Sequence, residues 1–144
     1  MALKFGKIVQ TVYIEASPEE VYDAFLDAKK HGAFTGSPAT TNAKVGAEFH
    51  AWDGYITGKN VELVKGKKIV QEWETSEWPK GYPRSRLELT FTPKKGGTEL
   101  KMVHSQVPAE QVDEYTSGWP ESYWEPLKAY FAEPRKPKKK KAVA

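Results

Sequence analysis

The sequence predicts a single α+β domain in which a curved antiparallel sheet of about six to seven strands packs against a long C-terminal helix. Three observations support this fold class. Residues 118–131 carry large apolar side chains at helical spacing, residues 41–107 alternate short β-prone segments with turn residues, and a capped helix stands between the first strand and that meander. A helix with so much aromatic surface needs a broad apolar partner, which a curved sheet provides.

The N-terminal region predicts a strand followed by a helix. Residues 8–15 are rich in β-branched side chains and place three aliphatic residues on one face, which is typical of a strand. Ser17 and Glu20 have the spacing of a capping box, with Pro18 at the first helical position, so a helix should begin there. Its buried face should comprise Val21, Tyr22, Phe25 and Leu26. Residues 29–41 contain two glycines and a proline, which indicates a loop or a short broken helix.

The central region predicts a meander of six antiparallel strands after this first helix. Asp53 and Gly54 form a hairpin turn pair that tolerates positive φ, and Pro79 and Gly81 indicate a long loop at residues 77–82. The strands are expected at residues 43–45, 48–52, 55–64, 68–75, 86–93 and 98–107. Alternation in the last two strands directs one face toward the helix, namely Leu87, Leu89, Phe91, Leu100, Met102 and His104.

The C-terminal region predicts a short helix from Pro108 to Tyr115 and then the long one. Gly118 can end the first of these helices, and Pro120 suits the first turn of the second. Pro126 lies inside the helical pattern, so we expect a kink or an irregular turn near it. The buried face of the long helix should comprise Trp119, Tyr123, Leu127 and either Tyr130 or Phe131.

Charge and composition exclude several classes of function. The formal net charge is +3, but six positive charges lie between Arg135 and Lys141, so residues 1–133 carry −3. A net negative charge on residues 1–133 argues against nucleic-acid binding, because binding phosphates needs clustered positive charge. We expect one domain at residues 1–133 and a disordered Lys-rich tail at residues 134–144. The chain has no cysteine, no signal-peptide core and no apolar run of the roughly 18 residues that a membrane span requires, so we expect a cytoplasmic protein without a membrane partner.

The chain also lacks the motifs of common catalytic sites. Its histidines, His31, His50 and His104, do not have the spacing of metal ligands, and no nucleophile elbow or phosphate-binding glycine loop is present. We therefore expect no catalytic residue, no metal and no cofactor. His104 faces the helix and has two interpretations, a buried histidine bonded to a backbone carbonyl or to Tyr123, or a contact for a ligand.

A strongly bent sheet and a long helix seldom close completely on each other, so a pocket is expected between them. The aromatic side chains of the two elements can serve as a closed core or as the wall of that pocket. His104 and Tyr123 are the expected polar groups. The candidate ligand-binding residues are Phe34, Trp52, Trp73, Trp78, Phe91, Met102, His104, Tyr123, Trp124 and Leu127.

Several segments carry a resemblance to a known family. They are residues 16–22, 53–58, 68–73, 98–100 and 118–131, together with Trp-Pro-Lys-Gly at 78–81 and Val-Pro at 107–108. In this order they resemble the family called activator of heat-shock protein 90 ATPase homologue, within the START-like or helix-grip superfamily. The sequence looks most similar to the C-terminal domain of the eukaryotic co-chaperone, and the resemblance covers nearly all of residues 11–131.

The resemblance implies a non-enzymatic, co-chaperone-like protein that binds a heat-shock protein 90-type chaperone or another protein partner. The co-chaperone has a separate N-terminal domain, and this chain begins at the equivalent of the second domain. Docking to a chaperone is therefore expected rather than full ATPase stimulation by this chain alone. The superfamily implies an alternative function, the binding of a small hydrophobic molecule or a cyclase-like activity in the pocket.

Overall fold

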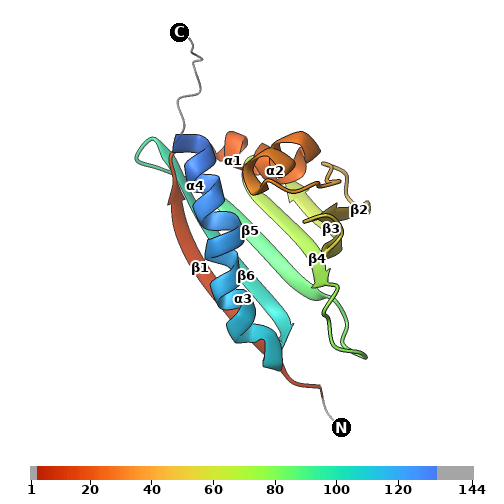
Figure 1. Cartoon of the computed structure of the whole chain (residues 1–144). Coiled ribbons are helices and arrows are strands. Elements are labelled where there is room, and N and C mark those ends of the chain that lie inside the picture. The colour runs from red at the N-terminus through yellow and green to blue at the C-terminus, as the bar shows by residue number, and fades with distance from the viewer. Residues whose placement is uncertain (1–2, 133–144) are drawn as a thin grey trace.

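The computed structural model describes residues 3–132, and it consists of one six-stranded antiparallel sheet with all of its helices on one face (Figure 1). The strand order is β1-β6-β5-β4-β3-β2, which confirms the predicted α+β class. The predicted tail at residues 134–144 lies outside the described residues. The elements are β1 (Phe5–Ile14), α1 (Pro18–Leu26), α2 (Ala28–Thr35), β2 (Glu48–Ala51), β3 (Ile56–Val64), β4 (Lys68–Thr75), β5 (Ser85–Lys94), β6 (Gly97–Pro108), η1 (Ala109–Gln111), α3 (Val112–Trp119), η2 (Pro120–Trp124) and α4 (Glu125–Ala132).

The predicted capping box at the start of α1 is confirmed. The Ser17 hydroxyl accepts a hydrogen bond from the Glu20 amide at 3.2 Å, and the Glu20 carboxylate accepts one from the Ser17 amide at 3.0 Å. These two bonds satisfy amides that the helix itself leaves without partners. The predicted apolar face is buried, namely Val21, Tyr22, Phe25 and Leu26.

Residues 28–35 form the helix α2, where the sequence indicated a loop or a broken helix. The Asp27 carboxylate accepts a hydrogen bond from the Lys30 amide at 3.0 Å, which caps the start of the helix. Gly36 ends it with a φ of 77°, a left-handed conformation that glycine adopts without strain. The helix buries His31 and Phe34.

The predicted strand at residues 43–45 is absent, so the sheet has five strands after α1 and not the six expected. The side chain of Asn60 explains the difference. Its Nδ2 atom donates to the carbonyl oxygens of Asn42 at 3.0 Å and Lys44 at 3.1 Å. These carbonyls are therefore bound to one amide side chain instead of a strand ladder, and the segment runs as a loop across the edge of β3.

The C-terminal helical region is continuous from η1 to α4, and Gly118 does not interrupt it as predicted. The expected irregular turn is confirmed just before Pro126, where η2 is a π-helical turn closed by the bond from the Glu125 amide to the Pro120 carbonyl. Both Tyr123 and Trp124, which lie in this turn, are buried.

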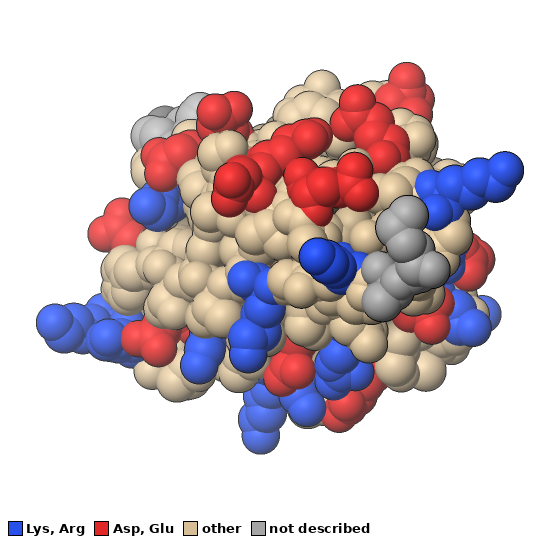
Figure 2. All heavy atoms as spheres, turned by 90° about the horizontal axis from the view of Figure 1, so that it is seen from below, with Lys and Arg blue, Asp and Glu red and all other residues tan. Residues whose placement is uncertain are grey.

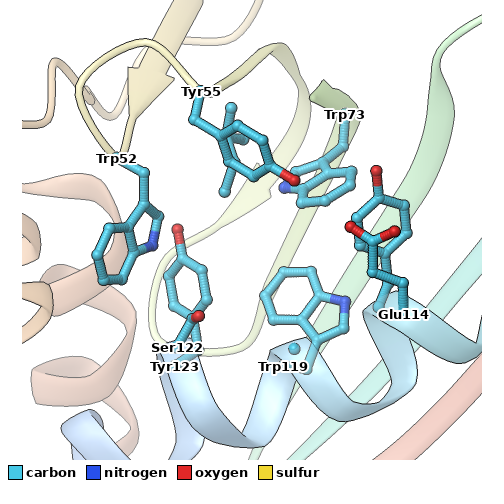
Figure 3. A pocket seen from close by; sticks show the side chains of 10 residues that line it. Trp52, Tyr55, Trp73, Glu114, Trp119, Ser122 and Tyr123 are labelled. Carbon is cyan, nitrogen blue, oxygen red and sulfur yellow. The ribbon is translucent and has the colours of Figure 1, made fainter. Parts of the chain in front are cut away.

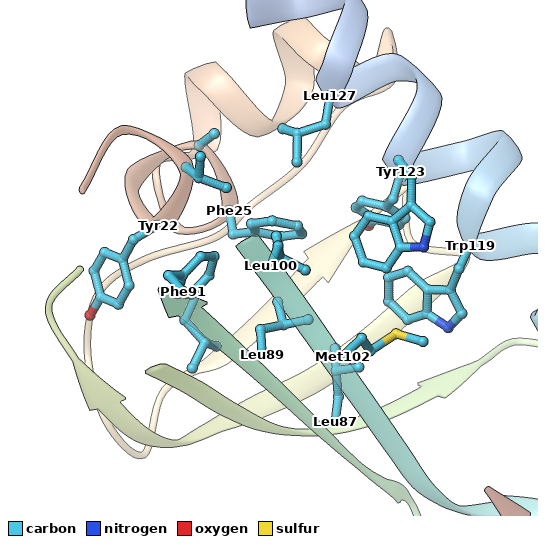
Figure 4. Packing of buried hydrophobic residues seen from close by; sticks show 14 of the residues in the cluster. Tyr22, Phe25, Leu87, Leu89, Phe91, Leu100, Met102, Trp119, Tyr123 and Leu127 are labelled. Carbon is cyan, nitrogen blue, oxygen red and sulfur yellow. The ribbon is translucent and has the colours of Figure 1, made fainter. Parts of the chain in front are cut away.

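The core lies between this long helix and the sheet, as predicted (Figure 4). Trp119, Tyr123, Leu127 and Phe131 are buried on the helix, and they face Leu87, Leu89, Phe91, Leu100 and Met102 of the sheet. Six strands span about 24 Å, whereas one helix covers about 10 Å. The long helix lies on the side of β1, and α1 and α2 cover one end of the remaining sheet. No helix of residues 3–132 covers the other end of the sheet, over β3 and β4, so only side chains can fill the space there.

Candidate functional site

A pocket of about 220 Å³ opens at this uncovered end, between the long helix and the sheet (Figure 3). Its volume corresponds to roughly seven water molecules, below the 300 to 1,000 Å³ of pockets for drug-sized ligands. The lining is mainly aromatic and consists of Trp52, Tyr55, Ile56, Trp73, Glu114, Tyr115, Gly118, Trp119, Ser122 and Tyr123.

One face of the helical region forms half of the wall. Each of five lining residues lies three or four positions from others of the set, which places them on a single helical face: Tyr115, Gly118, Trp119, Ser122 and Tyr123. A side chain at Gly118 would point into open space, because a Cβ built there has no neighbour within 4 Å. The glycine therefore contributes to the volume of the pocket.

The turn between β2 and β3 supplies Trp52 and Tyr55 on the opposite side of the pocket (Figure 3). Trp52 and Asp53 have φ values of 52° and 55°, and Gly54 continues the turn at 89°. The sequence indicated a turn pair at Asp53 and Gly54 that tolerates positive φ. A left-handed conformation is rare for a residue as large as tryptophan and costs about 1 to 3 kcal/mol. The fold thus maintains backbone strain at a residue that lines the pocket.

A carboxylate lies at each side of the Tyr55 hydroxyl. Tyr55 donates a hydrogen bond to Glu77 Oε1 at 2.9 Å, and Glu114 from α3 lines the pocket beside it. Partial burial raises the pKa of Tyr55, and the hydrogen bond to Glu77 and the negative charges of Glu77 and Glu114 add to the rise. The rim of the pocket therefore has a negative potential.

Tyr115 lines the pocket and is held in place by two hydrogen bonds. Its hydroxyl lies 2.7 Å from Thr75 Oγ1 and donates to Gln111 Oε1 at 3.0 Å. Burial raises the pKa of Tyr115. Its ring lies edge-on to Trp73, with ring centroids 5.4 Å apart, so the two aromatic rings form a rigid corner.

Tyr123 connects the pocket to the buried interior. Its hydroxyl donates to His31 Nε2 at 3.0 Å, because the other ring nitrogen of His31 must donate to the Phe25 carbonyl at 2.9 Å. Burial raises the pKa of Tyr123 and lowers that of His31. The indole N–H of Trp52 points toward the Tyr123 hydroxyl, which offsets part of the rise in the pKa of Tyr123. Trp52 Nε1 nevertheless forms no hydrogen bond within residues 3–132.

His104 lies behind the pocket in a second chain of hydrogen bonds. Trp119 Nε1 donates to His104 Nδ1 at 3.1 Å, so the proton of the neutral ring is on Nε2, which donates to Ser85 Oγ at 2.8 Å. Ser85 in turn donates to the Trp73 carbonyl at 2.7 Å. The predicted partners of His104, a backbone carbonyl or Tyr123, are therefore wrong, and it is His31 that binds Tyr123.

Ser85 and His104 do not form a nucleophile with its general base, although they are hydrogen-bonded to each other. In that role His104 Nε2 would have to accept the serine proton, but here Nε2 carries a proton of its own. Burial lowers the pKa of His104 to about 3. Both side chains are also almost completely buried, with 0% and 1% exposure for His104 and Ser85, so no substrate reaches them.

Of the ten predicted ligand-binding residues, three line the pocket: Trp52, Trp73 and Tyr123. Their role in binding a ligand stays a prediction. Trp78 stacks on Tyr115 outside the lining, and the Trp124 indole donates to Gln10 Oε1 at 2.6 Å. The remaining members are buried away from the pocket, namely Phe34, Phe91, Met102, His104 and Leu127.

The sequence analysis missed several lining residues, including Tyr55, Glu114, Tyr115 and Gly118. Helical spacing from Trp119 could have identified Tyr115 and Ser122, which lie one turn before and about one turn after it. Tyr55 had no such signal, because its position depends on the strained turn.

The structure shows neither a metal cluster nor a membrane helix within its described part. No three His, Asp or Glu side chains among residues 3–132 are placed to hold a metal ion. None of the helices over the same residues is long and apolar enough to cross a membrane.

Comparison with known proteins identifies similar chains. Residues 15–132 match the family model described as Activator of Hsp90 ATPase homolog 1-like protein. The chain is 39% identical over 115 residues to the human Activator of 90 kDa heat shock protein ATPase homolog 1, and 32% identical over 119 residues to the homolog from Dictyostelium discoideum. These alignments cover 80% and 82% of this chain, but only 34% and 31% of the relatives. The chain therefore corresponds to about a third of either relative.

The fold is also similar to solved structures. A crystal structure of an HSP90 activator from Plasmodium falciparum superposes with a TM-score of 0.78 at 26% identity, covering 91% of this chain and 97% of that one. The superposition therefore covers nearly all of both chains.

Proposed function

Because the chain belongs to the Activator of Hsp90 ATPase homolog 1-like family, we propose that it is a non-enzymatic protein that docks onto an Hsp90-type chaperone. The observation that supports this proposal most strongly is the 39% identity to the human activator over 80% of the chain. The similarity to the Plasmodium falciparum HSP90 activator, a chain covered to 97%, adds to it.

The chemistry of the described residues supports a role without catalysis. His31 and His104 are buried, and each uses both ring nitrogens in hydrogen bonds within the protein. Burial keeps both rings neutral, so neither is available as an acid or a base near neutral pH. The titratable side chains among the lining residues are Glu114 and three tyrosines, and the pKa values of the tyrosines are raised, so they are neutral near neutral pH.

The proposal is tested by isothermal titration of the whole chain into a purified Hsp90-type chaperone, with the ATPase rate of the chaperone measured in the same samples. We expect saturable binding. Because the chain corresponds to about a third of the human relative, we expect the ATPase rate to change less than it does with a full-length activator. Absence of binding at chaperone concentrations of 100 μM or so, at low salt, would contradict the proposal.

A second candidate function is the binding of a small apolar molecule. The observation that favours it is the aromatic pocket of about 220 Å³, which is open to solvent on one side. An apolar fluorescent probe should then bind at one saturable site and change the emission of Trp52, Trp73 or Trp119, which line the pocket. Probe binding that is unaffected by filling the pocket at Gly118 would exclude this function.

A further inference from the structure

The carboxylates of the sheet and those of the long helix differ in their partners. All six carboxylates on the strands form ion pairs with lysine or arginine, namely Glu48, Glu62, Glu72, Glu74, Glu88 and Glu99. Arg84 alone serves three of them, at 2.9 to 3.8 Å. Each strand carboxylate therefore has a basic partner within the molecule.

The long helix has the opposite property. Residues 109–132 contain five carboxylates and one basic residue, Lys128, which pairs with Glu125. The other four form no ion pair with any residue that the structure describes, and all are exposed: Glu110, Asp113, Glu114 and Glu121. We call these four residues the acidic strip.

The separation of charge is visible at the end of the molecule where α3 begins (Figure 2). Carboxylates gather on the upper half of this view, and most lysines and arginines lie on the lower half. A surface with uncompensated charge attracts a partner of opposite sign and increases the rate of encounter.

Glu114 joins the acidic strip to the pocket, because it belongs to the strip and also lines the cavity. Behind it the wall consists of rings, among them Trp73 and Trp119, whose centroids are 5.6 Å apart. The faces of such rings attract cations, and tryptophan does so most strongly. Partly desolvated rings beside a carboxylate therefore favour a cationic group over a neutral one.

We propose that the pocket receives an arginine side chain from a basic segment of a protein partner, with the acidic strip binding the neighbouring basic residues. The aliphatic stem of such a side chain would contact the rings, and its charged end would lie near Glu114. The choice of a protein partner rests on the proposed docking function.

The position of the charges favours a protein segment over a free organic cation. Only Glu114 among the acidic strip lines the pocket, and Glu110, Asp113 and Glu121 lie outside it on the helix surface. A small cation inside the pocket would leave these three carboxylates unpaired. An extended basic peptide can place one side chain in the pocket and others beside the three carboxylates. The pocket volume of about 220 Å³ also suits one side chain rather than a whole ligand of drug size.

The test uses synthetic peptides and needs no chaperone. The acetylated and amidated peptide Gly-Lys-Arg-Lys-Gly is titrated into the whole chain labelled with ¹⁵N, and the indole N–H signals of the tryptophans are followed by NMR. The matched peptide carries citrulline, which has the shape of arginine without its charge. We expect one-site binding of the arginine peptide, weakened by salt, and about fivefold weaker binding of the citrulline peptide.

Two variants assign the binding to the pocket. Gly118→Leu fills the cavity from a position where a Cβ has no neighbour within 4 Å, so we expect the fold to persist and peptide binding to fall by about tenfold or more. Glu114→Gln removes the charge at the pocket and should weaken binding by roughly two- to fivefold. Glu125→Gln is the matched control, because it makes the same charge change on the same helix outside the pocket and should alter binding by less than about twofold.

Two results would overturn the inference. One is equal binding of the arginine and citrulline peptides, which would show that the pocket does not select the charge of arginine. The other is unchanged binding to Gly118→Leu, checked for its native fold by circular dichroism. If either result is found while the chain still binds the chaperone, this inference fails and the proposed function stands. Specific peptide binding without chaperone binding would support the inference and contradict the chaperone as partner.

Discussion

His31 and His104 connect elements of the interior that would otherwise have unpaired polar groups. His104 links the Trp119 indole of the long helix to Ser85 of β5, and His31 links α1 to the Tyr123 hydroxyl. Each ring is a donor at one nitrogen and an acceptor at the other, which only the neutral form of histidine allows. Protonation of either ring would place a second donor opposite a donor or would bury an uncompensated charge.

The free energy of unfolding should therefore fall in mild acid. The folded-state pKa of His104 is about 3, well below the ordinary 6.5 of the unfolded chain. Between these values the unfolded chain binds a proton that the folded chain does not, so stability is full above about pH 6.5 and decreases as the pH drops toward 3. The slope should approach 1.4 kcal/mol per pH unit for this residue, and the lowered pKa of His31 adds in the same direction.

Urea denaturation at several pH values between 7.5 and 4.5 measures this slope. The variant His104→Gln cannot titrate, so it should be less stable at pH 7.5 by about 1 to 3 kcal/mol but should show a shallower slope. Equal slopes for wild type and His104→Gln would show that this ring is protonated in the folded state.

Two buried threonines should respond in opposite ways to the loss of their hydroxyl. Thr98 Oγ1 donates to the Ala16 carbonyl at 2.7 Å, whereas Thr41 Oγ1 is buried without a hydrogen-bond partner among residues 3–132. Thr98→Val should lower the free energy of unfolding by about 1 to 3 kcal/mol, and Thr41→Val should leave it unchanged or raise it by up to about 1 kcal/mol. Chemical denaturation checks both, and an equal cost at the two positions would contradict the hydrogen-bond assignment.

The long helix contains a glycine in its interior, and replacing it should stabilise the protein. Gly118→Ala should raise the free energy of unfolding by about 0.5 to 1 kcal/mol, because alanine is a better helix former and its Cβ would have no neighbour within 4 Å. The measurement is the urea concentration at the midpoint of unfolding, provided that the dependence of the unfolding free energy on urea concentration is unchanged.

The matched substitution in the sheet should have the opposite effect. A Cβ at Gly58 of β3 would overlap the Glu72 carbonyl oxygen and the ring of Phe49, so Gly58→Ala should be destabilising by about 1 to 3 kcal/mol. If both variants were destabilised, the space beside Gly118 would be smaller than the structure shows.

Local signals predicted most helices and strands, and the exceptions have identifiable causes. The capping box of α1 and the alternation of β5 and β6 are properties of adjacent residues, so the sequence alone predicts them. Residues 43–45 have β-prone character, but the Asn60 side chain occupies their carbonyls, and that contact depends on the tertiary fold. The π-helical turn was expected only as an irregularity near Pro126, because its hydrogen bonds cannot be inferred from the position of a proline.

The candidate site follows from the whole architecture rather than from any one element. A bent sheet and one helix predicted a gap, and three of the candidate residues, Trp52, Trp73 and Tyr123, line the pocket that the structure has there. Which end of the gap stays open depends on where α1 and α2 cover the sheet, and sequence patterns do not contain that information. For the same reason His104 was expected to face the gap, whereas the structure buries it completely.

The distribution of charge is also a property of the whole molecule. The formal charge of −3 over residues 1–133 suggests only a mildly acidic body. In three dimensions the strand carboxylates are paired and those of the acidic strip are not, and one of the unpaired ones, Glu114, lines the aromatic pocket. This arrangement agrees with a protein that presents one surface to a basic partner.

The most direct test of the account is an NMR titration of the ¹⁵N-labelled chain with a purified Hsp90-type chaperone. If the chain docks onto the chaperone through the pocket side, the amide signals of α3 and the indole signals of Trp52 and Trp119 should broaden first, as the complex forms. Signals from the opposite face of the sheet, such as Thr11 and Lys101, should be affected least. Unchanged spectra, or broadening that begins on that opposite face, would contradict the account.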